Sequence, residues 1–225
     1  MPRTNRRSQN TFTIPSQGSI VLPPLTAPSP DQEVTITFPV SSKIATGLHW
    51  HETHTEYLQI VQGVALITFG DSTSRFTPKS GVITIPRFVV HGYRRADSVP
   101  STSSIKVEEG DEDDGRYIAL IVKEWTDPAD GDKGIFFGNV VGLVLDRGAE
   151  AGILGNLWLA WSLFVVFWEW DNFPRLVKMP RLWGVGKVLE RSITWAFLGS
   201  AAGLGRCVGV RGAYEDYGTK QDLAS

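Results

Sequence analysis

Residues 47–63 constrain the fold more than any other stretch of this sequence, because they carry metal-ligand residue types at spacings that suit β-strands. His49 and His51 are two residues apart, so on a strand both side chains project from the same face. Glu56 follows five residues later, and His91 follows a short apolar run that ends in proline. Three imidazoles and one carboxylate form a ligand set for a divalent metal ion.

Glu56 has the wrong parity to share a face with His51 on one continuous strand. A turn at residues 52–55 resolves this, because it folds the chain into a hairpin that places Glu56 opposite His51. Directly opposed side chains of antiparallel strands have Cβ atoms about 4.5–5.5 Å apart, so both can reach one ion. His54 falls in this predicted turn. We expect it to be exposed, the alternative being a supporting contact to a metal ligand.

A second strand is predicted at residues 89–93, where His91 and Tyr93 share one face. Tyr93 is therefore expected beside the ligands and is the candidate catalytic acid or base. The alternative is an ordinary aromatic side chain that fills the interior. Five apolar residues of neighbouring predicted strands are candidates to line a pocket for an aromatic ring: Val34, Ile36, Phe38, Leu58 and Ile60.

These residues resemble the first of the two sequence motifs of the cupin superfamily, which reads G-x5-H-x-H-x4-E-x6-G. Four positions match it in identity and spacing: His49, His51, Glu56 and Gly63. The leading glycine of the motif falls at Lys43, and we expect Gly47 to supply the turn instead. The resemblance covers about residues 30–125 and implies a jelly-roll barrel that holds a metal ion.

The second cupin motif, G-x5-P-x-G-x2-H-x3-N, is matched less closely. Pro86 and His91 agree with it, while Gly81 lies one residue too close to the proline. Phe88 stands at the position of the second glycine, and Arg95 stands at the position of the asparagine. The metal-ligand positions of both motifs are kept, whereas the turn positions of the second motif are shifted or occupied by other residues.

The predicted fold class is mainly β: a single cupin-type jelly-roll barrel with a C-terminal α-helical extension. Short strands punctuated by glycine and proline support the barrel. The predicted segments are an irregular N-terminal arm at residues 1–30, the barrel at residues 31–126 with an acidic loop insertion at about 96–115, and a helical extension and polar tail at 127–225. Residues 19–22 are a candidate edge strand within the arm. Arg3, Arg6 and Arg7 are expected to lie in its disordered start.

The C-terminal segment is unusually apolar. Residues 133–146 show helical periodicity, and residues 151–168 follow without a single charge. Eighteen uncharged residues meet the lower limit for a membrane-spanning helix. We expect these helices to pack on the barrel and to form a homodimer, because they carry more apolar surface than one barrel face can cover. Contact with a membrane surface through residues 151–170 and a full span are the alternatives.

Composition narrows the class of protein further. The net charge is −2 and 42% of residues are hydrophobic, which gives no electrostatic case for nucleic acid as a partner. Cys207 is the single cysteine, so no disulfide framework forms and a reducing compartment is favoured. The first thirty residues contain no apolar run of the kind a signal peptide needs. We therefore expect an intracellular, cytoplasmic protein, with membrane association as the alternative.

Two sequence patterns after the predicted barrel make the resemblance to cupins more specific. The segments Glu-Trp-Thr-Asp-Pro at residues 124–128 and Phe-Phe-Gly-Asn at residues 136–139, followed by apolar helices, resemble single-cupin-domain oxidoreductase-like proteins of fungal secondary-metabolite (polyketide) gene clusters. Gly138 departs from the Phe-Phe-Arg-Asn of that group. The resemblance implies an oxidoreductase that acts on a small aromatic or polyketide intermediate.

Three functions stay open from the residues alone. The ligand set does not distinguish Fe, Mn, Zn, Ni and Cu, and we slightly prefer Fe(II). A redox-active ion would give an oxidase or oxygenase. An ion that acts only as a Lewis acid would give an isomerase, dehydratase or cyclase. The third function is a non-catalytic cupin that binds a small molecule or helps a partner enzyme.

Overall fold

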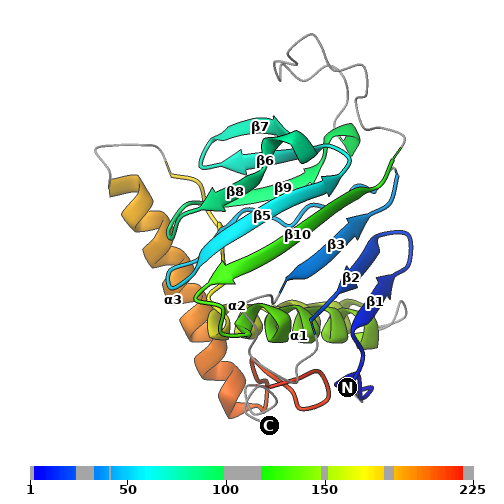
Figure 1. The fold of residues 1–225 in the computed structure, drawn as a ribbon. Coiled ribbons are helices and arrows are strands. Elements are labelled where there is room, and N and C mark those ends of the chain that lie inside the picture. Colours follow the sequence, from blue (N-terminus) through cyan, green and yellow to red (C-terminus); the bar gives the residue numbers. More distant parts are fainter. Residues whose placement is uncertain are drawn as a thin grey trace. The chain divides into compact units, whose positions relative to one another are not determined.

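The computed structural model describes residues 3–23, 33–40, 42–98, 118–147, 152–179 and 185–219. The chain consists of two compact units (Figure 1). The barrel unit comprises Asn10–Pro23 and Asp31–Pro128, and the helical unit comprises Met1–Gln9, Pro24–Pro30 and Ala129–Ser225.

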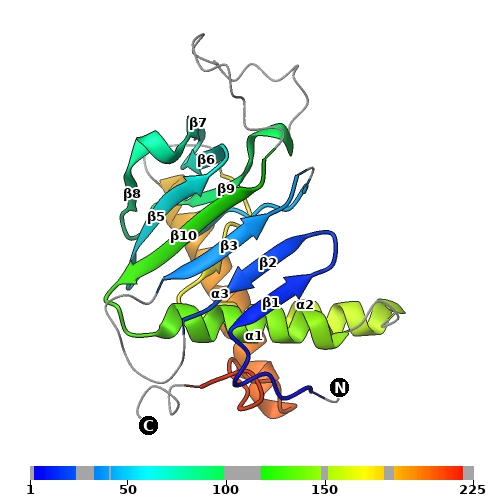
Figure 2. The same ribbon diagram turned by 45° about the vertical axis from the view of Figure 1, so that its right-hand side comes forward.

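The barrel unit contains two antiparallel sheets, as a jelly roll does (Figures 1 and 2). One sheet has the order β1 (Thr11–Ile14), β2 (Gly18–Val21), β3 (Val34–Phe38), β10 (Leu120–Asp127), β5 (Thr55–Gln62) and β8 (Val82–Ile85). Within this unit the other sheet has the order β4 (His49–Trp50), β9 (His91–Arg95), β6 (Ala65–Phe69) and β7 (Ser72–Phe76). The predicted fold class is confirmed.

Short 3-10 turns accompany these strands at η1 (Pro78–Ser80) and η2 (Ala96–Ser98). The acidic loop predicted at about residues 96–115 begins at η2. From residue 99 to residue 117 it lies outside the described residues.

Alternating side chains build the interior of the barrel unit. On β3 every second residue is buried, which is the period expected of a strand with one face toward a core. The five apolar residues predicted to face inward are all buried: Val34, Ile36, Phe38, Leu58 and Ile60. Burying each such side chain is worth about 1.5–3 kcal/mol. Glu56 on β5 and Glu124 on β10 share these inward faces and are themselves buried.

Strands β1 and β2 correct the expectation of an irregular arm over residues 1–30, although the candidate edge strand near residues 19–22 agrees with β2. Phe12 and Ile20 are paired across the hairpin, and both are buried. Ile20 also pairs with Ile36, so the hairpin extends the larger sheet. Only two large side chains point inward from these short strands, which is why their polar composition concealed them.

The helical unit contains α1 (Asp132–Arg147), α2 (Gly152–Glu169) and α3 (Val185–Cys207), with a two-residue strand segment β11 (Phe173–Pro174) between α2 and α3. Helices α2 and α3 run antiparallel: Trp161 Nε1 donates to the Ala201 carbonyl at 2.9 Å, and the rings of Phe164 and Phe197 lie 4.9 Å apart. A small cluster of Ile135, Val166 and Trp170 joins α1 to α2. Three helices after the jelly roll agree with the predicted extension.

Asn139 explains part of the sequence pattern on α1. Its side chain is fully buried, donates to the Gly218 carbonyl at 3.1 Å and accepts from the Tyr214 N–H at 2.8 Å. A buried amide needs such partners, because an unsatisfied polar group in the interior is costly. Asn139 therefore ties the C-terminal segment to α1.

Among the described residues, α2 is the one helix whose length and composition would suit a membrane span. Its mean hydropathy is 1.3, and 22% of the window Gly152–Glu169 is buried. Core helices of soluble proteins meet the same criterion of length and composition. Ile153, Leu154 and Leu157 are 79%, 82% and 62% exposed. The homodimer and the membrane-surface contact through residues 151–170 stay predictions.

The N-terminal residues join the helical unit through Asp146, which corrects the expectation that Arg3 and Arg6 lie in a disordered start. The Asp146 carboxylate accepts hydrogen bonds from the Thr4 N–H, the Arg6 guanidinium and the Tyr217 hydroxyl. Burial by itself would raise the pKa of Asp146, but these hydrogen bonds together lower it. Arg3 pairs with Asp216 nearer the surface. Sequence spacing gives no sign of contacts between residues so far apart.

Asp146→Asn should lower the free energy of unfolding by about 1–3 kcal/mol at neutral pH, because hydrogen bonds to a charged group are lost. Since the folded-state pKa of Asp146 is lowered, its contribution is present above the usual value of 3.8 and disappears as the pH falls through the folded value. Urea unfolding at several pH values should show variant and wild type converging in acid.

Asp216→Asn is the matched control, because its partially exposed pair with Arg3 is worth under about 1 kcal/mol. If Asp146→Asn is as stable as wild type at pH 7, Asp146 does not anchor the N-terminal residues.

Candidate metal centre

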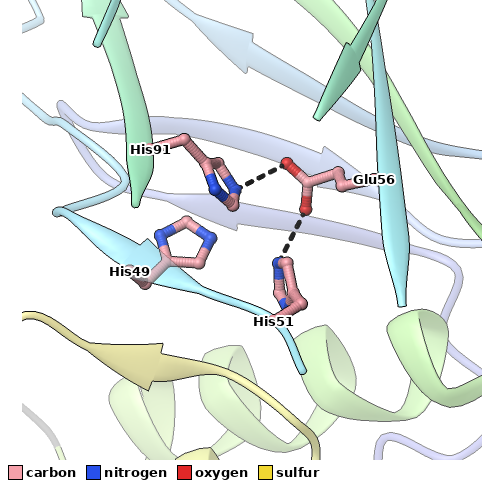
Figure 3. Close-up of side chains that lie close together, drawn as sticks. All are labelled: His49, His51, Glu56 and His91. Carbon is pink, nitrogen blue, oxygen red and sulfur yellow. Dashed lines mark hydrogen bonds and ion pairs between the residues drawn. The ribbon is translucent and has the colours of Figure 1, made fainter. Parts of the chain in front are cut away.

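The four predicted ligands meet inside the barrel unit (Figure 3). One ligand atom from each of His49, His51, Glu56 and His91 lies within 4.8 Å of the others. His49 comes from β4, Glu56 from β5 and His91 from β9, while His51 directly follows β4. The cluster thus draws on both sheets.

The route of the chain through the cluster differs from the predicted hairpin. Strand β4 pairs with β9, where His49 lies opposite His91, and β5 pairs with β10 and β8 in the other sheet. Glu56 therefore meets His51 across the interior and not as a neighbour on paired strands. The long strand β5 already has a partner on each edge, so β4 cannot add to it.

His54 is also placed differently from the prediction, because it is buried and not exposed. Residues 51–54 link two sheets and do not form a protruding hairpin turn. The His54 Nδ1 atom lies 3.0 Å from the Thr53 hydroxyl oxygen. It is not among the four clustered side chains.

Glu56 is the centre of the cluster's polar contacts (Figure 3). Its Oε2 atom lies 3.1 Å from His51 Nε2, and its Oε1 atom lies 3.2 Å from His91 Nε2. The ring centroids of His49 and His91 are 4.3 Å apart. Glu56 and His91 are each 1% exposed, whereas the His51 side chain is 12% exposed. The cluster is therefore more accessible from the side of His49 and His51, which are both partly exposed, than from the side of Glu56 and His91.

Backbone carbonyls orient two of the rings. His49 Nδ1 lies 3.1 Å from the Gly47 carbonyl oxygen, and His91 Nδ1 lies 2.9 Å from the Val89 carbonyl oxygen. A carbonyl oxygen accepts a hydrogen bond, so each Nδ1 carries the proton and each Nε2 can present a lone pair to a metal. This is the usual orientation of a metal-binding histidine.

Electrostatics favour the neutral form of His49. Burial lowers its pKa most, and the neighbouring His91 and His51 lower it further. Glu56 and the Gly47 carbonyl oppose this shift, but the pKa stays well below its usual value. The neutral imidazole is the form that binds metal ions.

Two unusual backbone positions support the cluster. Gly47 has φ +76°, which agrees with its predicted role in the turn before His49. Phe88 has φ +65°, at the position where the cupin motif has a glycine. A non-glycine residue rarely adopts this conformation, and it costs of order 1–3 kcal/mol. The Phe88 N–H donates to the His51 carbonyl at 2.7 Å, so the strained residue holds His51 in place.

Tyr93 and Glu124 lie in the same interior. Tyr93 is 2% exposed, as expected of a residue that shares a face with His91. Burial raises the pKa of Tyr93 most, and the Glu124 and Glu56 carboxylates raise it further. Its role as catalytic acid or base stays a prediction. Glu124 is an inward-facing residue that sequence reasoning did not single out, although its spacing from Leu120 and Val122 on one strand signals that position.

Neither a protein-family model nor a curated protein matches this chain. Solved structures match it at low identity. The capsular polysaccharide assembling protein CapF from Staphylococcus aureus is 17% identical, with a TM-score of 0.36 over 51% of this chain and 27% of the CapF chain. An oxalate decarboxylase from Lactobacillus farciminis, in a formate complex, is 18% identical, with a TM-score of 0.34 over 51% of this chain and 29% of its own.

A cupin superfamily protein from Desulfitobacterium hafniense DCB-2 is 16% identical, with a TM-score of 0.32 over 50% of this chain and 79% of its own. The match spans less than a third of the CapF and oxalate decarboxylase chains. Likeness at this level carries no argument about activity. The more specific resemblance to proteins of fungal gene clusters stays a prediction.

Gly92→Ala should disrupt the cluster through sterics alone. A Cβ atom at Gly92 would lie 2.2 Å from the Gly47 carbonyl oxygen, the atom against which the His49 ring is oriented. Strand β9 must then move away from residue 47, which separates His49 from His91. We expect urea unfolding to show a loss of about 1–3 kcal/mol and metal titration to show weaker binding.

Gly203→Ala is the control, because an added Cβ there meets no heavy atom within 4 Å. Alanine is also the better helix former, so this variant should be as stable as wild type or more stable. Wild-type stability and metal affinity in Gly92→Ala would contradict the account of β9.

Proposed function

We propose that the protein is a metal-dependent enzyme, with His49, His51, Glu56 and His91 as the ligands of one divalent ion. The observation that carries this proposal is the convergence of four ligand atoms within 4.8 Å in the interior of the barrel unit. Three imidazoles and one carboxylate leave positions open on a five- or six-coordinate ion. A small molecule can then bind beside the protein ligands.

His91 supports a cation at this place. It has a hydrogen-bond acceptor at each ring nitrogen, the Val89 carbonyl at Nδ1 and Glu56 Oε1 at Nε2. A neutral imidazole carries only one N–H, so it can donate to one of these oxygens. With Nδ1–H donated to the Val89 carbonyl, the Nε2 atom of a neutral His91 would present its lone pair toward Glu56 Oε1. His91 Nε2 and Glu56 Oε1 would both be satisfied as ligands of a divalent ion held at this place.

We further propose that the bound metal supports oxidation of a small aromatic or polyketide intermediate in fungal secondary-metabolite biosynthesis. A redox-active ion of this type supplies electron transfer to O2 when it is bound. The chain itself supplies three imidazole ligands, one carboxylate and an interior that contains apolar side chains such as Phe38, Leu58 and Ile60. The apolar neighbours suit an aromatic ring, and the sequence patterns at residues 124–128 and 136–139 support the biosynthetic setting.

Replacing the ligands should remove the metal. The variants His49→Ala, Glu56→Gln and His91→Ala should each bind well under one ion per chain, because each loses a ligand or the charge that offsets the cation. Metal analysis of protein purified without a tag or chelator measures this directly.

Cys207→Ser is the control, since it replaces an exposed thiol of the helical unit and leaves the four ligands intact. It should keep the wild-type metal content. A full complement of one metal ion per chain in a His49→Ala and His91→Ala double variant would contradict the assignment of these residues as ligands.

Oxygen dependence tests the reaction type. With pathway intermediates as substrates, the iron-loaded protein should turn over in air and stop under strict anaerobic conditions. If the zinc-loaded protein turns over equally well without O2, the oxidation proposal is wrong. The protein would then be a Lewis-acid isomerase, dehydratase or cyclase. Tight binding of an intermediate without turnover by any metal form would point to a binding protein.

A further inference from the structure

Helix α2 carries large apolar side chains on a face that the helical unit does not bury. Six of them recur at helical spacing, which places them on one side of the helix: Leu154, Leu157, Trp158, Trp161, Phe164 and Trp168. None of the six is buried, and Leu154 and Leu157 are the most exposed. The buried positions of α2 include the small residues Gly155 and Ser162. We call the six side chains the α2 apolar face.

Two aromatic residues of α3 extend the α2 apolar face. The Trp195 ring centroid lies 5.1 Å from that of Trp168, and the Phe197 ring centroid lies 4.9 Å from that of Phe164. Trp195 is 50% exposed and Phe197 is 45% exposed. The residues that α3 buries are mostly small or polar: Gly186, Glu190, Thr194, Leu198, Ala202 and Gly205. A helix of a soluble protein normally shows the reverse pattern, so this surface needs a partner.

The part of the chain that carries this surface is basic. Residues 152–211 contain seven Lys and Arg residues against three Asp and Glu residues, although the whole chain has a net charge of −2. Glu190, the acidic residue of α3, is buried and forms an ion pair with Arg175 at 2.8 Å. The acidic charge of α3 is therefore neutralised inside the unit, and the charge that α3 presents outward is positive.

The basic residues of α3 border the aromatic extension. Arg191 precedes Trp195 by four residues and Arg206 follows it by eleven, so both lie on the Trp195 side of the helix. Lys187 lies one further turn back and is exposed. The Arg206 side chain is 69% exposed. Positive charges thus stand beside exposed aromatic rings on one helix.

A lipid surface complements this arrangement better than a second copy of the chain. In a symmetric dimer a surface meets its own copy, so the basic residues of one α3 would approach those of the other. Like charges brought together in an interface weaken it. Anionic headgroups offer the opposite charge, and Trp side chains suit the boundary between headgroups and acyl chains.

We propose that the helical unit binds the surface of membranes that contain anionic phospholipids. The α2 apolar face, with Trp195 and Phe197, enters the boundary of the acyl chains. Lys187, Arg191 and Arg206 lie among the headgroups. The contact is interfacial, because the charges along α3 keep that helix out of the hydrocarbon core. This inference goes beyond the proposed function, since the four metal ligands belong to the barrel unit.

Binding of the full chain to lipid vesicles tests the role of charge. The protein should sediment with vesicles of equal parts phosphatidylcholine and phosphatidylserine, and much less with vesicles of phosphatidylcholine alone. Added salt should weaken this binding. The double variant Lys187→Gln and Arg206→Gln should bind about 25-fold more weakly, at about fivefold for each basic residue. The matched control, Lys43→Gln with Lys79→Gln, removes two exposed charges of the barrel unit and should bind as the wild type does.

A second pair of variants tests the apolar contact. Leu154→Gln with Leu157→Gln should lower the affinity for the mixed vesicles by at least about tenfold, because two apolar side chains no longer leave water. Both leucines are exposed, so the variant should fold as the wild type does. Val61→Gln with Val82→Gln is the control, since it replaces two exposed apolar residues of the barrel unit and should leave vesicle binding unchanged.

Several results would overturn the proposal. Wild-type protein that does not bind the mixed vesicles, and that sediments as a dimer in the ultracentrifuge, would assign the surface to a second copy. Equal affinity for the two kinds of vesicle, or unchanged binding by either double variant of the helical unit, would refute the recognition of anionic lipid by these residues. Cellular protein that resists alkaline carbonate and dissolves only in detergent would show that α2 spans the bilayer. Metal analysis of the same variants keeps the two proposals apart, because their metal content should equal that of the wild type.

Discussion

The Glu56 carboxylate, shared between His51 and His91, is the interaction on which the rest of the site depends. Glu56 belongs to one sheet of the barrel unit and His91 to the other, so this contact connects the two sheets across the interior. A carboxylate with 1% exposure needs strong partners, because it has lost its water. Two imidazoles provide them at 3.1 and 3.2 Å, and a divalent cation would provide a stronger one. The same atoms therefore connect the two sheets and form the candidate metal centre.

Two backbone positions near the cluster show how closely the chain conformation constrains the residue type. A glycine at the position of Phe88 would adopt positive φ without strain, and Phe88 adopts it at a cost. Its N–H donates to the His51 carbonyl, so this turn forms with a non-glycine residue. Gly92 shows the opposite case, because the approach of Gly47 to β9 leaves no room for a Cβ atom.

Sequence reasoning predicted the fold class and the four clustered residues, because both depend on short-range patterns. Alternation at period two identifies inward positions such as Ile36 and Leu58, and the spacing of His49 and His51 places them on one face. The same reasoning failed where pairing is non-local. It joined β4 to β5 as a hairpin and left His54 exposed. Which sheet a strand enters depends on the partners that its edges find, and no local spacing encodes that choice.

X-ray absorption at the metal edge of the loaded chain tests the central claim most directly. The account predicts a first shell of nitrogen and oxygen at about 2.0–2.2 Å, with the outer-shell scattering of three imidazole rings. In the fraction of Glu56→Gln protein that retains metal, the scattering of the three imidazole rings should persist. The first shell should lose the oxygen of the carboxylate. A spectrum without imidazole scattering, or one that fits a single histidine, would contradict a centre built from His49, His51, Glu56 and His91.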